Sequence, residues 1–368
     1  NMLYDWFVTF RKEGFTEWNS SPYLPIDTLG FGSLYAFAQD PAMRELGREG
    51  MDFAYYLLAV HSQQGIFASS SGRTYIKEQF GNWSNCPSGL SWIGYGYGVP
   101  GHAGKGITSY CLSDYEPPKE FAQWFSIPRG KEMICQTTQG NDGYVDLYTY
   151  KTADYMMTSA NDFHPGEPGH QENPFQLTFN AVAQLWVTHP GERVLFGAAR
   201  PSYWAGNGTL PKVNQYKAFA GLIYDIAPEH PVDFTHLYLP SMEFDRCEVE
   251  GKWAFVQLGS AYAAVYCSNG MRMQDFGSNK DRECIAEGRR CIWLVRAAQA
   301  DEFAAFEDFK AAMRGAALDA DAEGRRYRFV DPVYGELRCQ WGETLYVNDA
   351  PMQYSGFDNY GKLTMQEK

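Results

Sequence analysis

The sequence predicts an α+β fold in which helices come first and a large antiparallel β-sandwich follows. Apolar residues in the first third recur at the three-and-four spacing of amphipathic helices. From about residue 127 the period changes to two, as in strands, and turn residues separate the runs. Helices that precede the strands, instead of alternating with them, indicate two blocks. We therefore expect a helical domain over residues 1–126 and a β-sandwich domain over residues 127–368.

Capping residues place the predicted helices. Asp27 can cap one helix, and Asp40-Pro41 combines an acidic cap with a proline at the first helical position of the next. The second helix keeps an apolar stripe over residues 43–58, which His61 continues, and Gly65 is expected to end it. Two helices joined by a short loop fit a helical bundle or a helical toroid.

The predicted strands alternate apolar and polar residues and are bounded by turn residues. Their ranges are 144–150, 176–188, 253–258, 261–267, 291–297, 326–330 and 344–347. One helix interrupts them, with an apolar stripe from Phe303 to Met313 and Asp301 as its expected cap. Many short antiparallel strands of this kind are typical of a sandwich.

Composition excludes several classes of function. The chain has 368 residues and a formal net charge of −13, which argues against a nucleic-acid partner because such proteins present a basic surface. No apolar run reaches the roughly 18–20 residues of a membrane-spanning helix. An anionic substrate would need a local cationic pocket, because the overall field repels it.

The eight cysteines are dispersed and form no CxxC pair, which favours buried free thiols over a disulfide framework. The start of the sequence has no cationic segment or cleavage site of a signal peptide. Both observations slightly favour a cytoplasmic location. Residues 2–8 have the pattern of the middle or end of an apolar helix, so we expect the N-terminus to be incomplete.

Two short phrases flank the second predicted helix and its neighbour: Glu17-Trp-Asn-Ser-Ser-Pro-Tyr23 and Gly72-Arg-Thr-Tyr75. Later phrases are Tyr155–Ala160, Gln171–Gln176, Thr188–Gly191 and Tyr203–Gly208. With the helical-then-β order, they resemble heparinase II/III-like and alginate-lyase-like proteins, which join an (α/α) toroid to an antiparallel β-sandwich. The resemblance covers most of the chain in architecture and implies a partial toroid here.

The resemblance implies a polysaccharide lyase that cleaves a uronate-containing glycan by β-elimination. The reaction removes the C5 proton of the uronate and expels the oxygen at C4. An oligo- or polysaccharide is then the expected partner, without nucleic acid or membrane, and a homodimer is compatible with the prediction. General acid–base catalysis of this kind contributes roughly 10²–10⁴ in rate.

Five residues are the predicted catalytic set. Tyr75 is the candidate base, and Arg73 shares its face in an extended loop, where a guanidinium favours the phenolate. Asn19 is the candidate neutraliser of the substrate carboxylate, His61 a partner base or neutraliser, and His170 the histidine from the β-region that the resemblance implies. Structural roles stay open for each: packing for Tyr75 and Arg73, a turn for Asn19, the core for His61 and a loop for His170.

The predicted substrate-binding residues combine flat rings with polar groups, which suit sugars. They are Glu17, Trp18, Tyr23, Glu172, Trp204 and Asn207. A buried tryptophan is the alternative role for Trp204. No cofactor is expected. His164, His170 and His189 lie near acidic residues, but the HExxH spacing of a helical zinc site is absent, so no metal is expected either.

Two other functions stay open. A glycoside hydrolase on the same scaffold would need two converging carboxylates, for which Glu17, Asp27 and Glu172 are the candidates. A non-catalytic carbohydrate-binding protein would explain the aromatic content equally well. The sequence has no GxGxxG opening a βαβ unit, no P-loop and no GxSxG elbow, which makes nucleotide and serine-hydrolase chemistry poor explanations.

Overall fold

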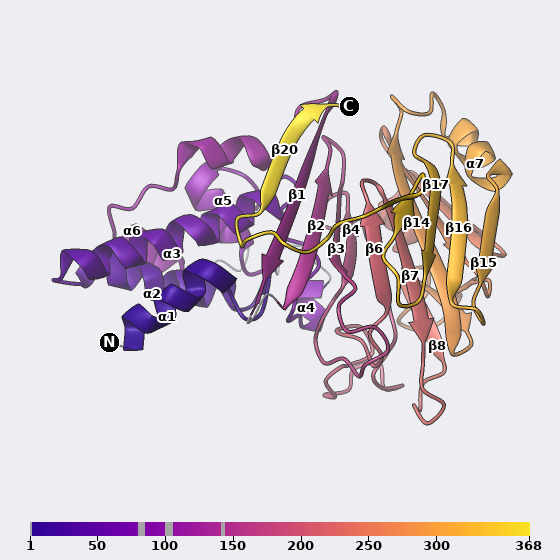
Figure 1. Ribbon diagram of the computed structural model, residues 1–368, viewed down its shortest axis with the longest axis horizontal. Helices are drawn as coiled ribbons and strands as arrows, with labels where there is room; N and C mark the ends of the chain where they lie inside the picture. Colours follow the sequence, from indigo (N-terminus) through magenta and orange to yellow (C-terminus); the bar gives the residue numbers. More distant parts are fainter. Residues whose placement is uncertain (1, 80–84, 100–105, 141–143) are drawn as a thin grey trace.

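The computed structural model describes residues 2–79, 85–99, 106–140 and 144–368, and it shows helices first and strands afterwards (Figure 1). The helices before the strands are α1 (Met2–Glu13), α2 (Leu24–Phe37), α3 (Pro41–Val60), α4 (Ile76–Gln79), α5 (Ser88–Tyr95), α6 (Ile107–Cys111) and the 3₁₀ helix η1 (Lys119–Trp124). The 3₁₀ helix η2 (Ser241–Glu243) and α7 (Phe306–Gly315) interrupt the strands. None of the helices among these residues is long and apolar enough to cross a membrane.

Three antiparallel sheets contain the strands. The nine-stranded sheet has the order β12-β13-β8-β5-β4-β3-β2-β1-β20, with β12 (Arg272–Met273), β13 (Glu283–Glu287), β8 (Phe234–Tyr238), β5 (Gln184–Thr188), β4 (Phe175–Thr178), β3 (Met156–Asn161), β2 (Val145–Lys151), β1 (Lys131–Gln139) and β20 (Lys362–Glu367). The six-stranded sheet has the order β6-β7-β14-β11-β10-β9, with β6 (Lys212–Tyr216), β7 (Phe219–Asp225), β14 (Arg290–Gln299), β11 (Ala261–Cys267), β10 (Trp253–Leu258) and β9 (Arg246–Glu250). The five-stranded sheet runs β15 (Leu318–Asp321), β16 (Arg326–Asp331), β17 (Gly335–Gln340), β18 (Tyr346–Val347) and β19 (Ala350–Pro351).

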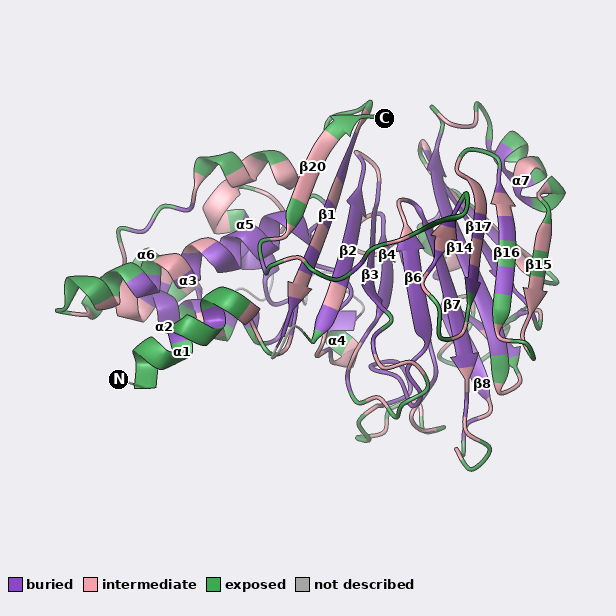
Figure 2. Cartoon of the chain, in the orientation of Figure 1, coloured by how far each residue is buried: buried purple, intermediate pink, exposed green. Residues whose placement is uncertain are grey.

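The nine-stranded sheet lies between the helices that precede the strands and the six-stranded sheet, whereas α7 lies on the far side (Figures 1 and 2). Successive residues of β1 face opposite sides, as the pleat requires. Met133 and Cys135 are buried in the core of the helical part, whereas Ile134 packs against the core shared by the sheets. On the far side, Phe219 of β7 stacks on Phe329 of β16, with ring centroids 5.7 Å apart. The predicted class, mixed α and β with antiparallel sheets, is confirmed.

Helix starts follow the capping chemistry only in part. The Asp40 carboxylate accepts a hydrogen bond from Ala42 N, so the predicted cap of α3 is confirmed. The prediction for Asp27 is wrong, because α2 begins at Leu24, with a proline in its first turn, and Asp27 lies inside that turn. Asp301 is not the cap of α7 either, because Ala305 takes that position.

The end of α3 also differs from the prediction. The last helical residue is Val60, and His61 is the C-cap, whose backbone N–H donates to Leu57 O. Gly65, with φ of +85°, instead lies in a tight turn closed by backbone hydrogen bonds between Gln63 and Ile66. A Cβ at Gly65 would lie 2.2 Å from the backbone of Gly98, so this close approach requires glycine.

Candidate active site

An extended segment over residues 71–75 connects the helical part to the nine-stranded sheet. Ser71 exchanges backbone hydrogen bonds with Asn173, N to O at 2.9 and 2.8 Å, and Thr74 N donates to Gln171 O at 3.0 Å. The Gln171 side chain also donates a hydrogen bond from Nε2 to Thr74 O, at 3.0 Å. The backbone that carries Arg73 and Tyr75 is therefore held like a short added strand beside the loop that leads into β4.

Glycine is required where this segment passes the first loop. Gly72 N donates to Trp18 O at 2.8 Å, and a Cβ on Gly72 would lie 2.5 Å from the Trp18 ring. Trp18 is itself buried and makes an edge contact with Phe163, with centroids 4.7 Å apart. The indole is therefore a packing element that sets the distance between the two sequence phrases.

Arg73 is the centre of a polar cluster. Its Nε donates to Glu17 Oε1 at 2.7 Å, and its Nη1 donates to Gln171 Oε1 at 3.2 Å and, more weakly, to the Tyr75 hydroxyl at 3.5 Å. The guanidinium also lies 5.2 Å from the ring centroid of Tyr23. The hydrogen bond to Glu17 raises the pKa of Arg73 above its usual value, so the charge is kept.

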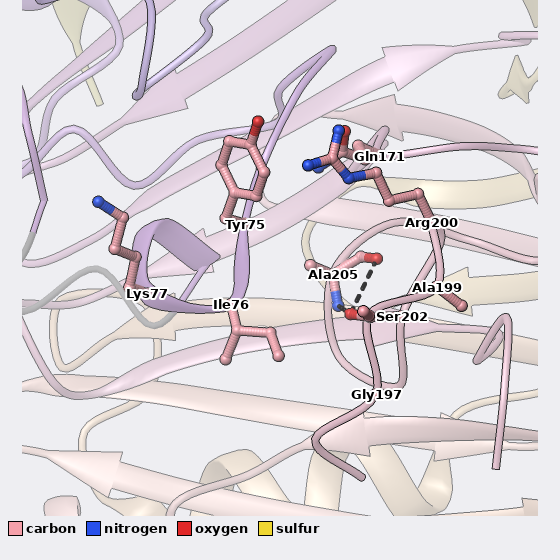
Figure 3. A pocket seen from close by; sticks show the side chains of 10 residues that line it. Tyr75, Ile76, Lys77, Gln171, Gly197, Ala199, Arg200, Ser202 and Ala205 are labelled. Atoms are coloured by element: carbon pink, nitrogen blue, oxygen red, sulfur yellow. Dashed lines mark hydrogen bonds between the residues drawn. The ribbon is translucent and has the colours of Figure 1, made fainter. Parts of the chain in front are cut away.

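Tyr75 lines a cavity of about 520 Å³ (Figure 3). The guanidinium of Arg200 lies 5.3 Å from the Tyr75 ring centroid. Lys77 also lines the cavity, and its ammonium is paired with the Glu78 carboxylate at 3.1 Å. The lining residues are Tyr75, Ile76, Lys77, Gln171, Gly197, Ala198, Ala199, Arg200, Ser202 and Ala205. No carboxylate is among these described lining residues, so the cavity suits an anion.

The loop over residues 197–205 forms one wall of this cavity, and buried contacts hold it. The Tyr203 hydroxyl donates to Glu283 Oε1 at 2.6 Å, and Glu283 also contacts His236 Nδ1 at 2.7 Å. The Trp204 ring stacks on His236 with centroids 4.2 Å apart at 14°. Hydrogen bonding to His236 and Tyr203 outweighs burial and lowers the pKa of Glu283. The loop is thus anchored by a buried carboxylate on β13.

A second cavity of about 380 Å³ lies on the Glu17 side of Arg73. Its lining residues are Trp6, Thr9, Phe10, Gly14, Phe15, Thr16, Glu17, Tyr23 and Asp27. Burial, and next the charge of Glu17, raises the pKa of Asp27 to about 7. This cavity therefore holds the Asp27 carboxyl group, whose pKa is near neutral pH, and the Glu17 carboxylate.

The structure brings four of the predicted residues together: Glu17, Tyr23, Arg73 and Tyr75 form the cluster just described. Three others lie elsewhere. Asn19 is buried, has φ of +45°, and donates from Nδ2 to Ser70 O at 3.3 Å, which is the turn role left open above.

His61 and His170 do not line either cavity. His61 is 1% exposed, and its Nδ1 lies 2.9 Å from Thr149 Oγ1. Burial, with a smaller contribution from Lys151, lowers the pKa of His61 to about 3, so it lies neutral in the core between helix and sheet. His170 is exposed, and its backbone N donates to Glu172 Oε2 at 2.5 Å.

The remaining predicted binding residues have structural partners. Asn207 is fully buried; its Oδ1 accepts from His189 N and the Tyr224 hydroxyl, and its Nδ2 donates to Glu172 O at 3.0 Å. Trp204 is 2% exposed and has the buried role left open above. Both residues lie within two positions of Ala205, which lines the cavity, so their contacts help to hold this part of the wall.

Sequence reasoning missed Arg200, Lys77 and Gln171 as site residues. Gln171 follows the Pro- and Gly-rich stretch that was interpreted as a loop, and Lys77 lies two residues after Tyr75. Arg200 is the single charge in the run Phe196-Gly-Ala-Ala-Arg-Pro201, where a cation flanked by small residues is a weak signal. Its proximity to Tyr75 arises only from the fold.

Within residues 2–79, 85–99, 106–140 and 144–368, no group of three or more histidine, cysteine or acidic side chains is arranged to hold a metal ion. Comparisons with protein-family models, with curated proteins and with solved structures found no match to this chain.

Proposed function

We propose that the protein is a polysaccharide lyase that cleaves a uronate-containing glycan by β-elimination in the Tyr75 cavity. The observation that carries the proposal is the environment of the Tyr75 phenol. Arg73 donates to its hydroxyl, Arg200 covers its ring, and the described lining of the cavity has cations without carboxylates. Because the formal net charge of the chain is −13, an acidic sugar needs local positive charge in order to bind, and the cations around Tyr75 supply it.

Each residue has a role in the proposed reaction. Arg200 binds the uronate carboxylate, which makes the C5 proton more acidic and stabilises the charge that develops on it. The Tyr75 oxygen takes the C5 proton, the C4–O4 bond breaks, and a C4–C5 double bond forms. The same proton then passes from Tyr75 to the departing O4, so the residue ends as it began. Gln171 and Glu17 hold Arg73 beside the phenol.

The proposal includes the toroid architecture. Helices α2 and α3 form a hairpin with a three-residue connection, and the loops near it carry Glu17 and Tyr23 on one side and Arg73 and Tyr75 on the other. In an (α/α) toroid, such loops surround one cavity. We propose that the described helices are part of such a ring, with the β-region supplying Gln171 and Arg200.

The Tyr75→Phe substitution tests this function. We expect the wild-type chain to release products with the ultraviolet absorbance of unsaturated uronates, and Tyr75→Phe to lower kcat by roughly 10²–10⁴ with little change in substrate affinity. Tyr144→Phe is the matched control, because Tyr144 is 48% exposed and lines neither cavity. Absence of unsaturated product from a broad panel of uronate glycans would contradict the proposal.

One observation favours a second candidate, a glycoside hydrolase. Of its three candidate carboxylates, Glu17 and Asp27 line the same cavity, whereas Glu172 does not. Asp27, with a pKa of about 7, has the property of a general acid, and Glu17 would be the second carboxylate. Release of reducing ends without unsaturation, abolished by Asp27→Asn and kept by Tyr75→Phe, would establish the hydrolase and exclude the lyase.

A further inference from the structure

The second cavity has the walls of a sugar site. Trp6 and Phe10 of α1 stack with centroids 4.9 Å apart at 14°, and Phe15 and Tyr23 contribute further rings from the loop and the start of α2. Trp6 and Tyr23 are 45% and 37% exposed, while Phe10 covers one face of the Trp6 ring and Arg73 lies over one face of the Tyr23 ring. Flat aromatic faces bind the apolar face of a sugar ring, and nearby carboxylates accept hydrogen bonds from its hydroxyls.

Hydrogen bonds of Arg73 connect the linings of the two cavities. Glu17, which lines the second cavity, accepts a hydrogen bond from Arg73 Nε at 2.7 Å. The other side of the same guanidinium donates to Tyr75 and Gln171, which line the first cavity. A glycan chain that places one sugar beside Tyr75 can therefore place a neighbouring sugar against the rings of Trp6 and Tyr23.

The two cavities differ in charge. The first is lined by Arg200 and Lys77, whereas the described lining of the second has Glu17 and Asp27 and no lysine or arginine. Within the described residues, Glu17 is paired with Arg73, and no cation pairs with Asp27. Above about pH 7, where Asp27 is ionised, a uronate or a sulfated sugar in the second cavity would meet the Asp27 carboxylate as a like charge, which costs affinity.

We propose that this second cavity is a subsite for an uncharged sugar, so that the substrate is a mixed glycan in which uncharged sugars neighbour the uronate that is cleaved. This inference rests on the proposed function for the position of the uronate. Glu17 and Asp27 accept hydrogen bonds from the sugar hydroxyls, and the aromatic rings pack against its face. A glycan made of uronates alone is disfavoured because it would place a carboxylate beside Asp27.

Binding measurements on the full chain with Tyr75→Phe test the subsite without turnover. The probes are two hexasaccharides, one that alternates uronate with an uncharged hexose and one made only of uronates, titrated by calorimetry at pH 8. We expect the alternating probe to bind roughly tenfold more tightly or better. Adding Asp27→Asn should weaken binding of the alternating probe and strengthen binding of the all-uronate probe, since it removes both an acceptor and the repulsion.

The opposite signs separate recognition from a structural role, because a merely structural Asp27 would weaken both probes together. Asp5→Asn on the exposed side of α1 is the charge-matched control and should leave the preference unchanged. If Asp27→Asn does not fold, Trp6→Ala provides the second variant, because Trp6 is half exposed; it should weaken binding of the alternating probe selectively.

The outcomes distinguish this inference from the proposed function. Equal binding of the two probes, or tighter binding of the all-uronate probe, would overturn the subsite even if unsaturated products form. A preference for the alternating probe that disappears with Asp27→Asn, found together with no unsaturated product from any glycan, would overturn the elimination and leave the subsite in place.

Discussion

Two bases are buried side by side where the helices meet the nine-stranded sheet. Lys151 of β2 donates from Nζ to Ala59 O at 3.0 Å and to Trp124 O, so it joins the end of α3 to η1. His61 lies next to it, and each is less than 2% exposed. Burial lowers the pKa of Lys151 to about 7 and that of His61 to about 3, because a charged form there loses its hydration.

Because of Lys151, the free energy of unfolding should depend on pH in the neutral to alkaline range. Between about pH 7 and 10.5 the unfolded chain binds a proton at Lys151 that the folded chain does not, so the free energy of unfolding rises with pH across this window. The slope from one group is at most about 1.4 kcal/mol per pH unit. Lys151→Met should remove it, as measured by urea unfolding at pH 7, 8.5 and 10, whereas Lys119→Met, at an exposed position, should keep it.

Sequence reasoning could predict part of the cluster, because Arg73 and Tyr75 are two residues apart and an extended backbone places them together. It could not predict the partners, since Glu17 and Arg200 approach only after the helical part packs on the sheet. His61 shows a second limit of prediction from sequence. A histidine at the end of an apolar stripe has the same pattern whether it faces a cavity or a core, and only burial distinguishes the two.

At the level of elements, the α2–α3 hairpin depends on glycine at its contact. A Cβ on Gly47 would lie 2.5 Å from the backbone N of Tyr35 and 2.8 Å from Phe31 O. These are backbone atoms, so the clash can be relieved only by separating the helices. Glu17, Tyr23 and Asp27 lie at the start of this hairpin, and its packing therefore sets the second cavity.

Gly47→Ala should destabilise the protein by about 1–3 kcal/mol, although alanine favours a helix by roughly 1 kcal/mol over glycine. Gly30→Ala is the matched control in α2, because nothing lies within 4 Å of a Cβ there, and it should be neutral or slightly stabilising. Thermal unfolding of both variants gives the comparison. Equal melting temperatures for the two would contradict a backbone contact at Gly47.

The helix starts show which local signals are sufficient. Asp40-Pro41 predicted the start of α3 because the cap and the proline act within one turn, independently of the rest of the fold. Asp27 and Asp301 have the same side chain, but tertiary packing begins α2 and α7 elsewhere. The predicted strands 253–258 and 261–267 match β10 and β11, whereas the predicted run 176–188 is two strands, β4 and β5, that pair with each other. Alternation identifies a strand but not its neighbour.

At the scale of the molecule, the order of helices and then strands was predictable, but the layering was not. The last strand, β20, pairs with β1 over six residue pairs, from Lys131–Glu367 to Gln136–Lys362, and forms the edge of the nine-stranded sheet. Its Leu363 and Met365 pack against the helical core beside Met133 and Cys135. The last strand therefore stabilises the helical part, a relation that no local pattern reveals.

Removal of residues 362–368 should consequently destabilise the helices more than the distant sheets. The deletion exposes the β1 edge and uncovers apolar side chains of the helical core, at about 25 cal/mol per Å² of apolar surface. Hydrogen exchange should show loss of protection in α3 and β1, while β11 and β14 stay protected. Leu363→Ala with Met365→Ala keeps the backbone pairing and should give a smaller loss in the same helix. Uniform loss of protection in all sheets would instead mean that the whole chain unfolds as one cooperative unit.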